Sequence, residues 1–331
     1  MSQLPDRMLA LAKRFAGFSP AERSALQAKM IAQGLSLDIL PIPPREAGIS
    51  ELPASYAQQR LWLVWQLDPQ SSTYNQPAQL RLRGQLNSTA LEQAIGQLIE
   101  RHEVLRTSFR WHEQQVLQVI HPQRQFALTR LDLSAAGEGA EALLAEQMTA
   151  LAEQPFDLER DLLLRATLIK LDAEQHVLLF CSHHIVCDAW SLPILVGEVS
   201  EGYRQALHGQ RAALPPLAVH YADYAHWQRL WLEAGEGERQ LAYWRAQLGD
   251  DHRLTSLPAS PARQAASANA AYCEVHEFHF SPALSEALRE FATARGVTLY
   301  MLLLAGFSVV VAQRSASRRV RLGTDVANRN H

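Results

Sequence analysis

Apolar positions recur along the chain with the two periods that distinguish helices from strands. One group follows helical spacing behind a polar cap at residue 87 or 88, namely Leu91, Ile95, Leu98 and Ile99. Leu80 and Leu82 alternate with arginines, which indicates a half-buried strand. Two neighbouring runs, 162–171 and 176–181, are also predicted to be strands. The second run is continuously apolar, so we expect it at the centre of a sheet.

Similar patterns predict the remaining elements. Further helices are expected at 140–151, 191–207, 220–232, 238–248, 282–295 and 299–312, and further strands at 116–120, 272–280 and 319–323. The N-terminal segment is also predicted to be helical, because Ser19-Pro20-Ala21-Glu22 combines a capping box with proline at the first helical position. This mixture of helices and strands indicates an α/β fold.

Two proline-containing stretches divide the chain into three predicted parts. Pro-Ile-Pro-Pro at 41–44 cannot continue a helix, so residues 1–45 are expected to be a helical segment with a stiff linker. Ala-Ala-Leu-Pro-Pro at 212–216 separates a first lobe, 46–213, from a second lobe, 214–331, with a similar strand–helix–strand order. The chain ends without a terminating signal, so we expect the second lobe to be incomplete. The N-terminal helices either pack on the main body or dock a partner chain.

Composition excludes several classes of protein. The 331 residues are 47% hydrophobic and 20% charged, which is typical of a globular protein. A formal net charge of −3 provides no basic surface for nucleic acid or an anionic membrane. The longest apolar run, 299–311, has the length of a core helix and not of a membrane span. Three cysteines without CxxC spacing, and no secretory signal, indicate reduced thiols in a cytoplasmic protein.

The segment with the clearest chemical potential runs from the apolar strand at 176–181 through a pair of histidines to a helix start. His183 and His184 are adjacent at the strand end, so their side chains should point in opposite directions and only one can face a given cavity. A metal site is disfavoured, because it would gather one histidine and Asp188 at most. Two interpretations stay open: a buried structural histidine pair, and a general base whose neutral imidazole accepts a proton at pH 7.

The surrounding residues favour direct transfer between two bound substrates over a covalent serine route. No GxSxG motif occurs, and the N–H groups of Ala189 and Trp190 at a helix start are candidate oxyanion donors. Asp188 is either an acid or, as we expect, a strut paired with a buried arginine. Arg101 and Arg106 are the candidate partners, and their alternative role is that of charges at a solvated helix end.

Five segments occur in a fixed order: SYAQQRLW at 55–62, RHEVLRT at 101–107, HHIVCDAWS at 183–191, YADYAHW at 221–227 and GTDVANRN at 323–330. Together they resemble the core motifs of condensation domains of non-ribosomal peptide synthetases, from residue 52 to the end of the chain. A lone HHxxxD would be weak, whereas five motifs in order are specific.

The resemblance implies a fold similar to chloramphenicol acetyltransferase, with two lobes in a V and the active site in a tunnel between them. It implies peptide-bond formation between a donor acyl or peptidyl thioester and an acceptor aminoacyl thioester. Both are carried on the phosphopantetheine arms of carrier proteins, and the domain itself binds no cofactor or metal. By motif position, His184 is the active-site histidine, His183 supports it, Asp188 is structural and Arg106 is its partner.

The same resemblance gives finer expectations. Family members usually have glycine where this chain has Ala189, and alanine would be strained there if the position required positive φ. The motif at 323–330 is more similar to domains that join an L-residue donor to an L-residue acceptor than to those with a D-residue donor. Because the chain starts at Met1, we expect the donor from another polypeptide, with residues 1–40 docking an upstream subunit. The alternatives are a starter domain for a fatty acyl group, an acyltransferase using coenzyme A, and a non-catalytic docking or gating module.

Overall fold

The computed structural model describes residues 3–250 and 277–324 of the chain. The described residues belong to two compact units, which are treated separately: residues 3–243, and residues 244–250 with 277–324. The predicted strand at 272–280 lies largely outside the described residues, and its last four residues have no regular structure.

A four-stranded sheet is the centre of the first unit. Its strands, in the order β2–β7–β6–β5, are β2 (Asn75–Arg83), β7 (Gln175–His183), β6 (Leu164–Lys170) and β5 (Thr129–Asp132). The pairs β2–β7 and β7–β6 are antiparallel, and β6–β5 is parallel. The two strands predicted at 162–171 and 176–181 are therefore confirmed. The continuously apolar one, β7, is flanked by a strand on each side, as expected.

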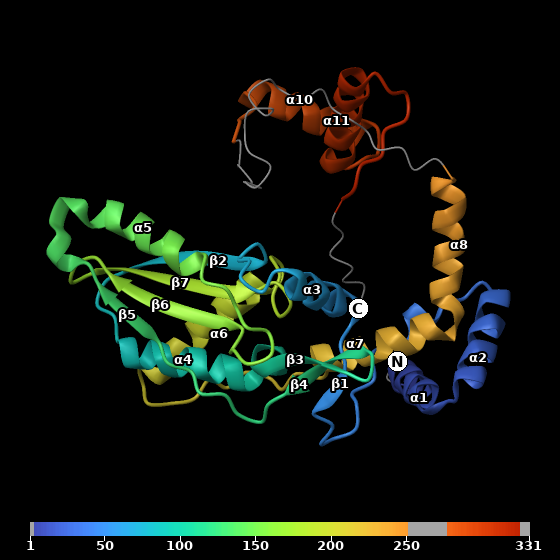
Figure 1. Ribbon diagram of the computed structural model, residues 1–331, viewed down its shortest axis with the longest axis horizontal. Helices are drawn as coiled ribbons and strands as arrows, with labels where there is room; N and C mark the ends of the chain where they lie inside the picture. Colours follow the sequence, from blue (N-terminus) through green and yellow to red (C-terminus); the bar gives the residue numbers. More distant parts are fainter. Residues whose placement is uncertain (1–2, 251–276, 325–331) are drawn as a thin grey trace. The chain divides into compact units, whose positions relative to one another are not determined.

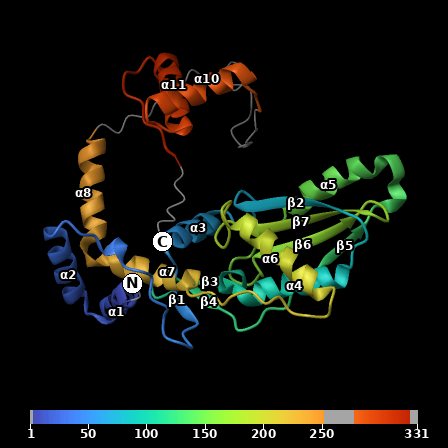
Figure 2. The same ribbon diagram turned by 180° about the vertical axis from the view of Figure 1, so that it is seen from behind.

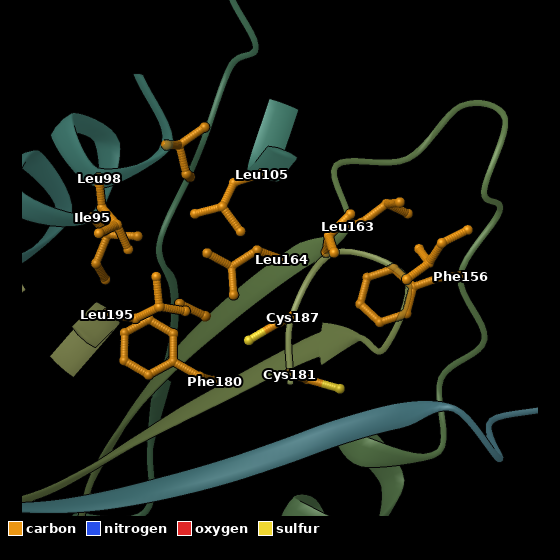
Figure 3. Close-up of a cluster of buried hydrophobic side chains, with 14 of the residues drawn as sticks. Ile95, Leu98, Leu105, Phe156, Leu163, Leu164, Phe180, Cys181, Cys187 and Leu195 are labelled. Atoms are coloured by element: carbon orange, nitrogen blue, oxygen red, sulfur yellow. The ribbon is translucent and has the colours of Figure 1, made fainter. Parts of the chain in front are cut away.

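Helices cover both faces of this sheet (Figures 1 and 2). One face carries α4 (Ser88–Arg101) and α6 (Ser191–Ala206), and the other carries α5 (Ala140–Ala152). Figure 3 shows part of the main core, which joins α4, α6 and the sheet through Ile95, Leu98, Leu164, Phe180 and Leu195. Helices α4 and α6 approach closely at Gly202, where an added Cβ would lie 3.1 Å from that of Ala94.

A second, smaller sheet lies beside helix α3 (Tyr56–Leu67). Its strands, in the order β1–β4–β3, are β1 (Glu51–Pro53), β4 (Gln115–Ile120) and β3 (Thr107–His112). Strand β4 matches the strand predicted at 116–120. Glu113 and Gln114 turn the β3–β4 hairpin with φ angles of 45° and 63°, a left-handed pair that suits the twist of a two-residue hairpin.

The N-terminal helices pack on the body of the first unit. They are α1 (Gln3–Gly17) and α2 (Pro20–Ala32), and the capping box at Ser19 is formed as predicted. They bury an apolar cluster against α7 (Tyr221–Trp231) and the π-helical turn Leu232–Glu236, with Phe15, Met30, Leu37, Leu230 and Ala234 among its members. The structure thus matches the packed helical pair, one of the two interpretations of this segment.

The compact unit also continues to Tyr243, beyond the lobe boundary predicted at 213, because α7 packs on β1 and the adjoining π-helical turn packs on α2.

The second unit is helical where it is described. Helix α8 (Gly237–Leu248) crosses the boundary between the units, and α10 (Pro282–Ala294) and α11 (Leu299–Ser315) confirm the two helices predicted there. The strand predicted at 319–323 is wrong: these residues are irregular, and the described part of the unit offers no strand with which they can pair. No single helix among the described residues could cross a membrane, although α10 and α11, bent by 105°, meet the length and composition test as a pair.

A buried charge network ties the linker to two other parts of the first unit. Arg45, only 13% exposed, binds Glu103 at 2.7 Å and Asp223 at 2.9 Å. Glu103 lies in the 3₁₀ turn Glu103–Arg106, and Asp223, 3% exposed, lies in the first turn of α7. One guanidinium therefore neutralises two poorly solvated carboxylates from distant segments.

We expect Arg45→Ala to lower the free energy of unfolding by about 3 kcal/mol, because in a poorly solvated site it leaves Asp223 without its cation and Glu103 with only the more distant Arg106. Urea unfolding followed by tryptophan fluorescence measures the change. The matched control is Arg81→Ala, which removes an exposed ion pair with Glu141 at 2.8 Å and should cost less than about 1 kcal/mol. Equal losses in the two variants would contradict the role assigned to the network.

Candidate active site

The end of strand β7 separates two adjacent histidines. His183 is its last residue and pairs with Asn75 of β2, whereas His184 begins the turn that leads to α6. His183 is 3% exposed and His184 is exposed. The opposite environments predicted from strand alternation are therefore present.

His183 is a buried, neutral imidazole. Its Nδ1 accepts the backbone N–H of Ile185 at 3.1 Å, which fixes the turn after His184. The rings of Tyr74 and Phe156 lie 6.2 Å from its ring, Phe156 in an edge-on arrangement. Burial, and to a smaller extent the neighbouring His184, lower the pKa of His183 from 6.5 to about 4. It therefore stays uncharged at pH 7 and keeps its lone pair for Ile185.

His184 is held in one orientation by the backbone around it. Its N–H donates to the Tyr74 carbonyl at 2.8 Å, and its ring Nδ1 lies 2.8 Å from the Cys187 carbonyl. A carbonyl only accepts, so Nδ1 carries a proton, and in the neutral ring Nε2 then carries the lone pair. Within the described residues Nε2 has no protein partner. An exposed imidazole with this tautomer can accept a proton from a bound amine or hydroxyl.

Asp188 is bound to the start of α6. Its Oδ1 accepts the N–H of Ser191 at 2.9 Å and the Ser191 hydroxyl at 2.6 Å. These bonds satisfy a donor at the N-terminus of α6 and fix the turn to the helix.

The two arginines expected beside Asp188 are bound elsewhere. The guanidinium of Arg106 donates to the carbonyls of Glu100, at 3.4 Å, and His121, and Glu103 lies 3.8 Å away. Arg101 binds Glu198 of α6 at 3.2 Å. The predicted Arg106–Asp188 pair is therefore not formed, because the carbonyls of Glu100 and His121 accept the hydrogen bonds of Arg106 instead.

Ala189 and Trp190 fill the turn between Asp188 and α6. Positive φ among the described non-glycine residues occurs at Glu113, Gln114 and Ala316, so Ala189 keeps a negative φ and is not strained by its Cβ. In this part of the chain the N–H groups of Ala189 and Trp190 have no protein acceptor, and both residues are exposed. These N–H groups are free to donate to a bound oxyanion.

Helix α3 supports the turn that follows His184. Ser55 caps α3 in a capping box with Gln58, and the Gln58 amide donates to the Ile185 carbonyl at 3.4 Å. The Ser55 hydroxyl also lies 3.0 Å from the Tyr221 hydroxyl of α7. The motif at 55–62 is thus in contact with both the motif at 183–191 and the motif at 221–227.

The motif at 101–107 joins this group through ion pairs. Arg101 and His102 bind Glu198 of α6, and Glu103 binds Arg45. Of the fifth motif, residues 325–330 lie outside the described residues.

Two aromatic residues of the site were missed by sequence reasoning. Tyr74 precedes β2, and Phe156 lies in the irregular segment between α5 and β6. Both reach the histidines only because the sheet brings distant segments together, and neither sits in a local pattern that signals a site. Among the described residues, no group of three or more histidine, cysteine or acidic side chains is arranged to hold a metal ion.

Comparison with known proteins identifies the family. The family model of the condensation domain matches residues 49–331 of this chain, so the chain belongs to the condensation domain family. Malpinin synthetase of Mortierella alpina is 37% identical over 285 residues, which are 85% of this chain and 4% of that protein. Phosphinothricin tripeptide synthetase PhsC of Streptomyces viridochromogenes is 34% identical over 320 residues, 96% of this chain and 29% of that protein. The chain thus spans a small part of these curated relatives.

Solved structures share the fold. The X-domain from teicoplanin biosynthesis aligns with a TM-score of 0.66 and 26% identity, over 82% of this chain and 59% of that one. The first condensation domain of the CDA synthetase aligns with a TM-score of 0.65 and 22% identity, over 83% of this chain and 64% of that one. These similarities confirm the predicted α/β fold class, and the match to the family model confirms the predicted family.

The depressed pKa of His183 predicts a specific loss of stability in acid. The unfolded chain binds a proton near pH 6.5 and the folded chain only near pH 4, so protonation favours unfolding as pH falls through this window. The corresponding loss is about 3 kcal/mol between pH 7 and pH 4. His183→Asn keeps an acceptor for Ile185 but does not titrate. Between pH 7 and pH 4 the free energy of unfolding of this variant should therefore fall by about 3 kcal/mol less than that of the wild type. Urea unfolding at pH 7, 5.5 and 4 measures both proteins, and parallel pH profiles would contradict the prediction.

Proposed function

We propose that this chain condenses a donor acyl or peptidyl thioester with an acceptor aminoacyl thioester. Membership of the condensation family supports the reaction class, which is peptide-bond formation in non-ribosomal peptide synthesis. The observation that carries the proposal for this chain is His184, an exposed imidazole whose Nδ1–H is held by a carbonyl while Nε2 is left as a proton acceptor.

In the proposed reaction the acceptor amine attacks the donor carbonyl. Nε2 of His184 accepts a proton from the amine as the C–N bond forms. The N–H groups of Ala189 and Trp190 stabilise the oxyanion of the tetrahedral intermediate. The C–S bond then breaks, and the departing thiolate takes the proton from His184. His183 and Asp188 act through structure: one holds the turn after His184, and the other holds the start of α6.

The proposed partners are donor and acceptor carrier proteins, with substrates on their phosphopantetheine arms. We further propose that both joined residues are of L configuration, in line with the resemblance of the motif at 323–330. Docking of an upstream subunit by residues 1–40 would have to use their outer surface, since the inner one is buried. Ile31, Leu35 and Ile39 are 46%, 46% and 51% exposed there.

A second candidate function is a non-catalytic docking module. The X-domain from teicoplanin biosynthesis, 28% identical to this chain in its complex with OxyB, illustrates that a domain of this fold can bind a protein partner. If this chain acts in that way, carrier binding should be measurable without any condensation product.

We expect His184→Ala to abolish formation of carrier-bound peptide, because it removes the group that is proposed to take the amine proton. The assay mixes the protein with loaded donor and acceptor carriers and detects the product by intact-protein mass spectrometry. His112→Ala is the matched control, because His112 is an exposed histidine at the end of β3. Product at the wild-type rate from His184→Ala would refute the assignment.

Two further arms of this assay separate the alternatives. Acyl coenzyme A in place of the donor carrier tests the coenzyme A acyltransferase, and a fatty acyl carrier tests the starter domain. Carrier binding without product from the wild-type chain, in every arm, would favour the docking module.

A further inference from the structure

A short segment between α5 and β6 is tied to the ends of two strands. We call residues 152–156 the strap. The Asn75 amide of β2 donates to the carbonyls of Ala152, at 2.7 Å, and Gln154, at 2.8 Å. Trp65 of α3 donates to the Phe156 carbonyl at 2.9 Å. The strap is thus anchored by the residue that pairs with His183 in the sheet.

Arg165 of β6 makes the largest set of contacts with the strap. Its guanidinium donates to the carbonyls of Gln154, at 2.9 Å, and Pro155, at 2.5 Å. It also lies 3.7 Å from the centre of the Phe156 ring, and Asp161 completes its surroundings at 3.3 Å. A planar guanidinium is suited to such simultaneous stacking and donation.

The last residue of the strap is Phe156, whose ring packs against the ring of His183. Phe156 is 1% exposed, and its ring forms a T-shaped pair with the ring of His183 at an interplanar angle of 80°. Arg165 pairs with Cys181 of β7, two residues before His183, so Arg165, Cys181 and His183 share one face of the sheet. A continuous series of contacts therefore runs from Arg165 through Phe156 to His183, and from His183 to the turn that orients His184.

We propose that Arg165 is a positioning residue for the histidine pair, acting through the strap and the ring of Phe156. The catalytic consequence rests on the proposed role of His184; the structural consequence does not. Without the guanidinium, the Gln154 and Pro155 carbonyls lose their donors and the Phe156 ring loses the cation that covers one face. Water then reaches His183, its hydrogen bond from Ile185 weakens, and the turn no longer holds His184 in one tautomer.

The first test is ¹⁵N NMR of the ring nitrogens in histidine-labelled full-length chain at pH 7. His184→Gln and His183→Asn assign the two residues. In the wild type we expect the His184 signals of a ring protonated at Nδ1, and in Arg165→Ala signals averaged between the two tautomers. Arg130→Ala is the matched control: Arg130, on the neighbouring strand β5, binds a carbonyl and a carboxylate but no part of the strap. Unchanged His183 and His184 signals in Arg165→Ala would overturn the proposal.

The second test is kinetic and uses the carrier assay. Arg165→Ala should lower kcat about ten- to a hundredfold through misorientation of His184, with KM for both carriers unchanged. Arg165→Lys should not restore the rate, because an ammonium cannot stack and donate to two carbonyls at once. Since Arg165 acts through Phe156, Arg165→Ala combined with Phe156→Leu should be no slower than the slower single variant. Multiplicative losses would contradict the pathway.

The two tests separate failure of this inference from failure of the proposed function. If the wild-type chain forms no product in any arm, the proposed function fails, and if His184→Ala retains condensation, the role of His184 fails. In both cases the tautomer shift in Arg165→Ala still decides whether Arg165 positions the histidines. If His184→Ala is inactive and Arg165→Ala gives wild-type spectra and rate, only the positioning role is refuted. A thermal melt of each variant verifies that the comparisons are made on folded protein.

Discussion

The antiparallel pairing of β2 with β7 is the constraint on which the candidate site depends. The last pair of this ladder is Asn75 with His183. Because the pairing ends there, His183 belongs to the sheet and His184 begins a turn. Side chains in a strand alternate between faces, so a slip of one residue would exchange the buried and the exposed histidine. The same pairing places Tyr74 beside both rings and Asn75 on the strap. The exposure of His184, on which its proposed chemistry depends, is thus a consequence of this register.

A second level of organisation consists of ion pairs that join segments far apart in sequence. Arg45 of the linker holds Glu103 and Asp223, and Glu198 of α6 holds Arg101 and His102. Paired burial of such groups contributes little net stability by itself, but it penalises any arrangement that separates the partners. The motif at 101–107 joins two such segments, because Arg101 and His102 bind Glu198 of α6 while Glu103 binds Arg45 of the linker. Its arginine at 106 contributes by holding backbone carbonyls.

Local patterns in the sequence were sufficient for most of the fold. The capping box at Ser19, the spacing of α4 and the apolar run of β7 each depend on residues near one another, so periodicity and capping identify them. The strand predicted at 319–323 fails for the opposite reason, because a strand needs a partner that its own residues do not specify. Likewise, strand alternation anticipated that His183 and His184 point in opposite directions. The absence of the Arg106–Asp188 pair depends on carbonyl acceptors for Arg106 that no local pattern around Asp188 reveals. Phe156 and Arg165 meet His183 only through the sheet, and no local pattern reports such contacts.

The close approach of α4 and α6 at Gly202 restricts how the family site can evolve in this chain. A Cβ at this position would press on Ala94, so a larger residue would have to push α6 away from α4. Helix α6 moves as a unit. Its first residue, Ser191, donates to Asp188, and the N–H groups of Ala189 and Trp190 lie directly before it. A shift at a site remote from the proposed chemistry would therefore be transmitted along the helix to the N–H groups that are proposed to bind the oxyanion. Selection on turnover would then preserve a glycine that touches no substrate.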